Sequence, residues 1–391
     1  MEQDAPVTAV SARSIFTPAA ILRIVLGWGT FGALLAVGSL LDPPVPTPIL
    51  VTALVIIVGV ILVCAFGVVH EAEHLAHRLG DPYGSLVLTL SIVLIEVVLI
   101  SAVMLGPGKQ ETIARDSVMA VSMIILNAVV GVSLLVGGLK RGGMQHNSTG
   151  TSSYLALIIV LSSLAFALPA LIGQDGSYTA GQEIPIIVLT LALYAFFLYR
   201  QMGTQADDFR EVDPRLAAAT PEDTAGVAVP RPRITAVIAE HRTEILLRVL
   251  LLVVTVLPIV LLSHDMATLL DDGLGRMGAP VALAGILIAM IVFLPESITS
   301  VRAALKGEVQ RVSNLCHGAL VSTVGLTIPA VLIIGALTGQ TVVLAESPTN
   351  LLMLGVTLLL TVTTFSAKKV TAMHGAAHLV VFAVYGITVF A

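Results

Sequence analysis

Apolar stretches of about 20 residues, separated by short polar segments, recur along almost the whole chain. A stretch of this length is what an α-helix needs to cross the hydrocarbon core of a bilayer. The pattern predicts an all-α polytopic membrane protein with about eleven transmembrane helices, and it leaves no room for a soluble domain. The predicted helices cover residues 19–41, 48–69, 84–105, 117–139, 153–173, 183–201, 244–263, 279–300, 312–337, 347–366 and 370–390.

The longest polar segment, residues 202–243, divides this pattern into two blocks. Residues 1–47 hold the N-terminal segment and one extra helix, whereas residues 48–201 and 244–391 each hold five predicted helices. Because five is odd, the two blocks must cross the membrane in opposite orientations. Inverted repeats of this kind are how many secondary transporters build two access states around one midplane site. The organisation therefore predicts an inverted-repeat transporter.

Acidic side chains crowd the segment 202–243. They are Asp207, Asp208, Glu211, Asp213, Glu222 and Asp223. This composition is typical of a disordered cytoplasmic linker. The alternative is an acidic segment that collects cations or regulates transport.

Composition and charge placement agree with the membrane interpretation. The chain is 56% hydrophobic and 12% charged, whereas soluble domains are about 25% charged. With the N-terminus inside, only Lys109, Arg115 and Arg276 of the 20 Lys and Arg fall in outer loops. We therefore expect a cytoplasmic N-terminus, a C-terminus outside and no cleaved signal peptide. Cys64 and Cys316 fall inside predicted helices, where buried inert thiols are expected.

One glutamate lies deep in the second helix of each five-helix block. The two helices read YGSLVLTLSIVLIEVVLIS, with Glu96, and GAPVALAGILIAMIVFLPESITS, with Glu296. Two like charges at the centre of a bilayer are tolerable only with a cation between them or with protons on them. The pair therefore predicts cation/proton antiport by alternating access, in which the same carboxylates bind cation or protons. Two protonated glutamates with only structural roles are the alternative.

The expected ligands of the cation are oxygen atoms. Helix breaks at Gly84, Pro295 and Pro329 would expose backbone carbonyls beside the two carboxylates. Such hard donors suit Ca²⁺, which takes about 6–8 oxygens, although Na⁺ and K⁺ also take oxygen ligands. We expect Ca²⁺/H⁺ exchange first, with Na⁺/H⁺ or K⁺/H⁺ exchange as alternatives. The partners are then the transported ions and the lipid bilayer, with no resident cofactor and no nucleic acid.

Two stretches resemble a known family. LGDPYGSLVLTLSIVLIEVVLISAVML and PESITSVRAALKGEVQRVSNLCHGALVSTVGLTIPAV are similar to the two α-repeats of the cation/proton exchangers in the calcium/cation antiporter superfamily. The resemblance is strongest to the bacterial ChaA-type calcium and sodium/proton antiporters and covers nearly the whole chain. It implies the exchanger fold, a place in the bacterial inner membrane and cation-binding roles for Glu96 and Glu296.

The resemblance also implies further site residues. The Asn of the family's third helix falls on Asn127, its polar GSSxQ stretch ends on Ser322, and Thr323 is the internal-repeat partner of Asn127. We expect all three to face the same cavity as the two glutamates, together with Ser91. The family's Gly-Asn-x-x-Glu motif falls on Ile92-Val93 and on Val292-Phe293, so both of its asparagines are missing. The preference for one cation therefore cannot be transferred from the calcium exchangers.

HEAEH, residues 70–74, favours a different class, because His-Glu-x-x-His on a helix can bind zinc in a peptidase. Asp271 and Asp272 would supply a third ligand, but the predicted topology puts them on the other side of a hydrocarbon core of about 30 Å. We therefore favour a solvated helix surface over an intramembrane zinc protease. The third interpretation is a pH-sensing or cation-gathering patch formed by His70, Glu73, His74 and His77.

Two histidines in the last predicted helix, His374 and His378, are spaced four residues apart. We expect packing or a proton path there rather than metal binding. A cation channel is the remaining class. Channels usually arrange equivalent groups around a symmetry axis, whereas one chain with two inverted halves suits alternating access. The oligomeric state and the ion stoichiometry do not follow from the sequence.

Overall fold

The computed structural model describes residues 15–41, 43–79, 111–212, 239–280 and 282–390, with eight further positions between 90 and 104. Ser91, the side chain of His77 and most of the acidic linker lie outside the described residues. The eight positions around Glu96 are all helical.

The described chain is built from helices. Their bounds are α2 Pro18–Ala36, α3 Thr47–Leu79, α5 Ile113–Met123, η2 Ile124–Val129, α6 Val130–Arg141, α7 Ser148–Ser162, η3 Ser163–Ala167, α8 Leu168–Ile172, α9 Ala180–Met202, α12 Arg242–Arg276, α13 Ala282–Val292, α14 Leu294–Lys306, α15 Val309–Ser322, η6 Thr323–Thr327, α16 Ile328–Thr338, α17 Pro348–Ser366 and α18 Ala372–Val389. Nine continuous helical stretches of the described part are long and apolar enough to cross a membrane, and the pair α13–α14 makes a tenth, bent by 58°. With the helical positions around Glu96, these account for the predicted eleven, and the all-α membrane fold is confirmed.

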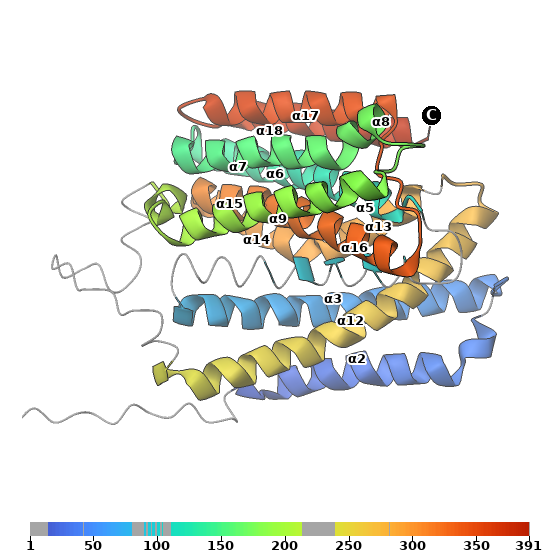
Figure 1. Ribbon diagram of the computed structural model, residues 1–391. Helices are drawn as coiled ribbons and strands as arrows, with labels where there is room; N and C mark the ends of the chain where they lie inside the picture. The colour runs from blue at the N-terminus through green and yellow to red at the C-terminus, as the bar shows by residue number, and fades with distance from the viewer. Residues whose placement is uncertain are drawn as a thin grey trace, which may run out of the picture.

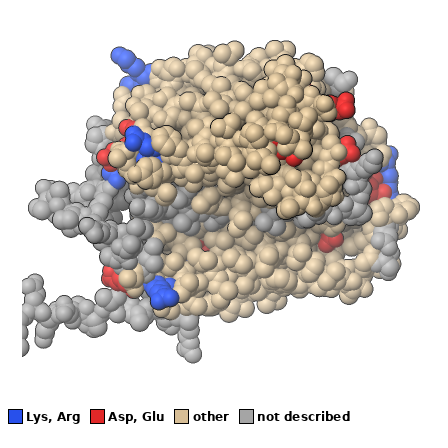
Figure 2. Space-filling view, viewed as in Figure 1, with Lys and Arg blue, Asp and Glu red and all other residues tan. Residues whose placement is uncertain are grey.

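The helices lie side by side as one bundle (Figure 1). α2, α3 and α12 pack against one another on one side, and α12 crosses the other two obliquely (Figure 1). α6, α7, α17 and α18 form the opposite side, with α14, α15 and α16 between the two groups (Figure 1). On the face in Figure 2, most of the visible Lys and Arg lie at the end where α12 begins, and the broad middle carries none. A wide surface without Lys or Arg fits a surrounding bilayer.

Two helices run further than the apolar pattern indicated. α3 continues from the predicted end at residue 69 to Leu79, and α12 continues from residue 263 to Arg276. Both extensions are polar, because they leave the hydrocarbon core while their backbone hydrogen bonds continue. Asp271 and Asp272 therefore lie in the last turns of α12, not in a loop as predicted.

The third helices of the two blocks share an interruption. α5 and α6 are joined through the π-helical turn η2, and α15 and α16 are joined through the π-helical turn η6. Asn127 lies fourteen residues from each end of the span 113–141, and Thr323 lies at the same depth in the span 309–338. π-Helical turns in otherwise α-helical segments are frequent at functional sites, because they re-aim side chains. Both turns therefore lie at the middle of their spans.

Glycines allow α6 and α18 to approach closely. A Cβ atom added at Gly138 would lie 2.2 Å from the backbone nitrogen of Ala372, and one at Gly375 would lie 2.3 Å from that of Leu135. No side chain fits into these gaps, so the two helices touch through their backbones. This contact brings His378 of α18 to the level of η2.

Candidate functional site

Glu96 is anchored by the second repeat. Its side chain is buried, and its Oε2 accepts a hydrogen bond of 2.5 Å from the hydroxyl of Thr323. Its Oε1 is also buried and has no hydrogen-bond partner among the described residues. A buried carboxylate oxygen without a donor requires a proton or a cation. Thr323 and Glu96, both predicted site residues, are thus in direct contact.

Glu296 lies at the break between α13 and α14. α14 begins at Leu294, and Pro295 is tolerated there because the first turn of a helix needs no donated backbone hydrogen bond. The Oε2 atom of Glu296 is buried and has no hydrogen-bond partner among the described residues. The carboxylate of the second repeat therefore also has a buried oxygen without a hydrogen-bond donor among the described residues.

The position of Glu296 follows from how α14 packs. The end of α14 lies beside the end of α6, because Arg141 donates to the carbonyl of Leu305 at 3.2 Å and Gly137 touches the carbonyl of Ala304. The two helices run in the same direction, so the start of α14 lies beside η2, and these two elements are in contact. Glu296 is therefore at the depth of Asn127.

Asn127 is fully buried, and its amide is occupied by other helices. Its Nδ2 donates to Thr357 at 2.9 Å, and its Oδ1 lies 3.3 Å from Nδ1 of His378. The Nε2 of His378 in turn lies 3.1 Å from the hydroxyl of Thr364. Asn127 thus links η2 to α17 and α18, and no hydrogen bond joins it to either glutamate within the described part.

Ser322 forms the next contact along α15. It accepts a hydrogen bond of 2.9 Å from the hydroxyl of Tyr194 in α9. Tyr194 also packs on Gly325, where an added Cβ would lie 3.1 Å from its ring. Ser322 is therefore buried beside Thr323, with its hydroxyl held by α9.

Sequence reasoning missed the threonines of α17. Thr357, Thr361 and Thr364 are fully buried, and Thr357 and Thr364 contact Asn127 and His378. They recur at i, i+4 and i+7, which places them on one face of the helix. This polar stripe in an apolar helix was a detectable signal.

The HEAEH segment is part of the long helix α3. Glu71 is buried and bonded at 2.6 Å to Arg248 of α12, whose Nε also contacts Glu244 at 3.1 Å. His70 and His74 are exposed, with ring centroids 4.6 Å apart. Glu71 therefore ties the first helices of the two repeats together and is not available as a general base.

The aspartates proposed as zinc ligands lie at the other end of α12. Asp272 accepts from the backbone nitrogen of Val45 and pairs with Arg276. Arg248, which contacts Glu71, is 24 residues earlier in the same helix, a rise of about 36 Å. The HEAEH segment and these aspartates cannot form one metal site.

His374 lies at the start of α18. Its Nδ1 accepts a hydrogen bond of 3.0 Å from the backbone nitrogen of Thr371, which makes it part of the helix cap. Cys64 and Cys316 are buried and unbonded to each other, as expected.

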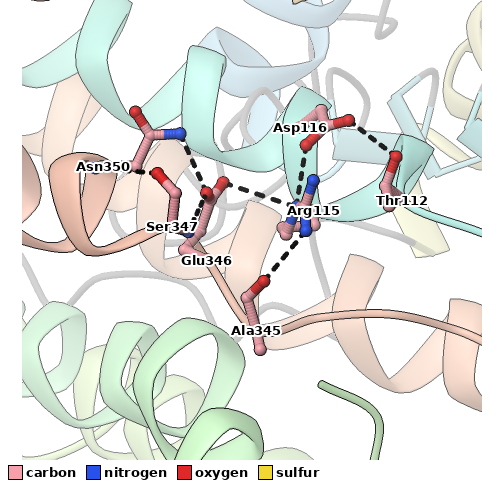
Figure 3. Close-up of polar contacts among 7 residues, drawn as sticks. All are labelled: Thr112, Arg115, Asp116, Ala345, Glu346, Ser347 and Asn350. Carbon is pink, nitrogen blue, oxygen red and sulfur yellow. Dashed lines mark hydrogen bonds and ion pairs between the residues drawn. The ribbon is translucent and has the colours of Figure 1, made fainter. Parts of the chain in front are cut away.

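A charged cluster joins α5 to the segment before α17 (Figure 3). Arg115 contacts Asp116 at 2.8 Å, the carbonyl of Ala345 at 3.0 Å and Glu346 at 3.8 Å. Glu346 Oε2 accepts from Ser347 and from Asn350 (Figure 3). Burial raises the pKa of Glu346, while the hydrogen bond from Asn350 and the charge of Arg115 oppose that rise. This cluster fixes the end of the bundle that is predicted to face outside.

The chain matches known proteins over most of its length. Residues 49–203 and 247–391 match the family described as sodium/calcium exchanger protein. The chain belongs to this family. Over 397 residues it is 30% identical to the sodium-potassium/proton antiporter ChaA of Escherichia coli (strain K12), with 100% of this chain and 99% of the antiporter covered.

Two solved structures share the fold. The H⁺/Ca²⁺ exchanger CAX superposes with a TM-score of 0.67 at 14% identity, covering 95% of this chain and 89% of that one. YfkE superposes with a TM-score of 0.65 at 16% identity, covering 94% and 99%. The protein is therefore a multi-pass membrane transporter of the cation exchanger class and not an enzyme, and the predicted membership of the calcium/cation antiporter superfamily is confirmed.

Proposed function

We propose that the protein exchanges a cation for protons at Glu96 and Glu296, which together hold either one cation or the returning protons. The observation that carries this proposal is the pair of unsatisfied buried oxygens, Glu96 Oε1 and Glu296 Oε2. A cation between the carboxylates, or protons on them, would remove both deficits. Because cation and protons need the same oxygens, binding one releases the other.

The neighbouring groups support a hard-cation site. The hydroxyl of Thr323 already contacts Glu96, and Ser322 and Asn127 lie in the adjacent turns η6 and η2 or next to them. The bend of 58° before Glu296 exposes carbonyls at the end of α13 that can add further oxygen ligands. Ser91 completes the proposed set.

Ca²⁺ is the first cargo that we propose, because two carboxylates balance a divalent charge without a proton. Exchange of Na⁺ or K⁺ is the second, and the similarity over the whole chain to a sodium-potassium/proton antiporter favours it. With a monovalent ion, one carboxylate would keep a proton. The proposed setting is a bacterial inner membrane with the N-terminus in the cytoplasm.

A vesicle experiment tests the proposal. Everted vesicles with an acidic interior are given Ca²⁺, Na⁺ or K⁺ in turn, and a fluorescent dye reports proton efflux. The expected result is saturable proton efflux with at least one cation, and none in vesicles without the protein. Unitary currents with no proton movement would instead show a channel.

A further inference from the structure

A string of buried hydrogen-bonding side chains runs from one end of the bundle towards its centre. The hydroxyls of Thr151 and Ser313 lie 3.1 Å apart, and Ser313 Oγ lies 2.9 Å from Nδ1 of His317. All three side chains are fully buried. Thr151 is in the first turn of α7 and Ser313 is near the start of α15, so the string begins at the end predicted to be cytoplasmic.

The inner end of the string approaches the proposed carboxylate site from both repeats. His317 precedes Thr323, the partner of Glu96, by six residues of one helix, a rise of about 9 Å. His317 is also close enough to His378 for their charges to interact, and His378 contacts Asn127. The string therefore ends less than two helical turns before Thr323 and close to His378.

His317 itself has an unsatisfied atom. Its Nε2 is buried and has no hydrogen-bond partner among the described residues. The ring packs edge-on against Phe365, with centroids 4.8 Å apart, and near Tyr154. The other ionisable groups around the ring are His146 and His378, with Cys316 beside it on α15. A neutral imidazole with one bonded and one open nitrogen can accept a proton on one side and release one on the other.

We propose that Thr151, Ser313 and His317 form a proton path between the cytoplasmic end and the paired carboxylates, distinct from the route of the cation. This proposal rests on the proposed cation/proton exchange. Hydroxyls both donate and accept, so Thr151 takes up a proton from the cytoplasmic side and passes its own to Ser313, while Ser313 passes its own to Nδ1 of His317. The proton on Nε2 of His317 then leaves towards the carboxylates. Each group gains one proton and loses one, so no charge remains on the path.

A cation cannot move along such a string, which makes the proposal testable. Exchange of a cation for protons needs the path, whereas exchange of labelled for unlabelled cation at equal pH needs only the carboxylate site. We compare both modes in proteoliposomes, using ⁴⁵Ca²⁺ or ²²Na⁺, whichever drives proton efflux in the wild type. Thr151→Val removes one hydroxyl at nearly constant shape, and Thr151→Ser retains it.

The variants should affect cation/proton exchange and labelled-cation exchange differently. Thr151→Val, Ser313→Ala and His317→Gln should lower cation/proton exchange about tenfold, less than the roughly 100-fold or more that a positioned proton-transfer group typically contributes. Labelled-cation exchange should stay within twofold, which also shows that each variant is folded. Thr151→Ser should be close to the wild type, as should Ser162→Ala, which removes a buried hydroxyl elsewhere in α7.

Two results would overturn the path. Equal losses in both modes would mean that the string supports the cation site or the fold. Undiminished proton coupling in Thr151→Val and Ser313→Ala would mean that protons travel elsewhere. Neither result bears on the exchange proposal itself, which is tested separately with variants of Glu96 and Glu296.

Discussion

The third helices of the two repeats have the same backbone interruption at the same depth, but their central side chains have different hydrogen-bond partners. Thr323 in η6 donates directly to Glu96 of the other repeat. Asn127 in η2, at the equivalent place, is bonded to Thr357 and His378 instead. One glutamate is therefore held by a short hydrogen bond, and the other stands at a helix bend.

This difference shows how an inverted repeat can be symmetric in fold and asymmetric in chemistry. The backbone is interrupted at the same place in both third helices, by the π-helical turns η2 and η6. The hydrogen bonds then separate the two glutamates: Glu96 accepts one from Thr323 of the other repeat, whereas Glu296 lies at the bend between α13 and α14.

The largest effect should come from the carboxylates. Glu96→Gln and Glu296→Gln keep the shape of the side chain and remove its charge, so each should lower exchange at least about 100-fold. The double variant should be no worse than either single one, because the pair acts as one unit. Dye-reported proton efflux from vesicles measures this. A single variant with near-normal exchange would place the coupling site elsewhere.

Replacing the two central polar residues should sharpen the difference between the repeats. Thr323→Val removes the donor to Glu96 and should weaken cation binding roughly tenfold. Asn127→Leu leaves Thr357 and His378 without their partner, so it should also lower the free energy of unfolding by about 1–3 kcal/mol. Cation titrations and thermal unfolding in detergent separate the two effects, with Thr323→Ser as the control. Identical behaviour would show that the repeats are equivalent.

A smaller effect is expected from breaking the ion pair that joins the first helices of the two repeats. Glu71→Gln leaves Arg248 buried with Glu244 alone, so it should lower stability by up to about 3 kcal/mol while folded protein still transports. His70→Ala, on the exposed side of the same turn, should change neither quantity. Transport per folded molecule and the unfolding midpoint are measured together. Peptidase activity that Glu71→Gln abolishes would reverse the interpretation.

The smallest effect concerns Glu346 at the other end of the bundle. Because burial raises its pKa in the folded state, its contribution to stability is full at low pH and is lost as pH rises through that pKa. Glu346→Gln keeps an acceptor for Ser347 and Asn350 and removes the charge. The variant should therefore unfold at an equal or higher temperature than the wild type at pH 8. The difference between their unfolding temperatures should become smaller towards pH 4. A clear loss of stability at pH 8 would show that the ion pair with Arg115 dominates.

The sequence predicted the features that depend on one helix at a time. The length of each apolar stretch predicted the membrane-spanning helices. The cost of placing a charge in lipid pointed to Glu96 and Glu296 as candidate site residues. It could not predict contacts between distant helices, such as Glu71 with Arg248 or Asn127 with His378, because these depend on how the helices are rotated and packed. The close approach of α6 and α18 through Gly138 and Gly375 is what brings His378 to Asn127. His146 and His317 were missed for the same reason.

Proton release on cation binding tests the central claim most directly. Purified protein in weakly buffered detergent solution is mixed with the transported cation while a pH indicator records released protons. The account predicts saturable release in the wild type, a cation affinity that falls as pH falls, and no release from the Glu96→Gln/Glu296→Gln double variant. Cation binding with no proton release, or equal release from the double variant, would contradict competition at one pair of carboxylates.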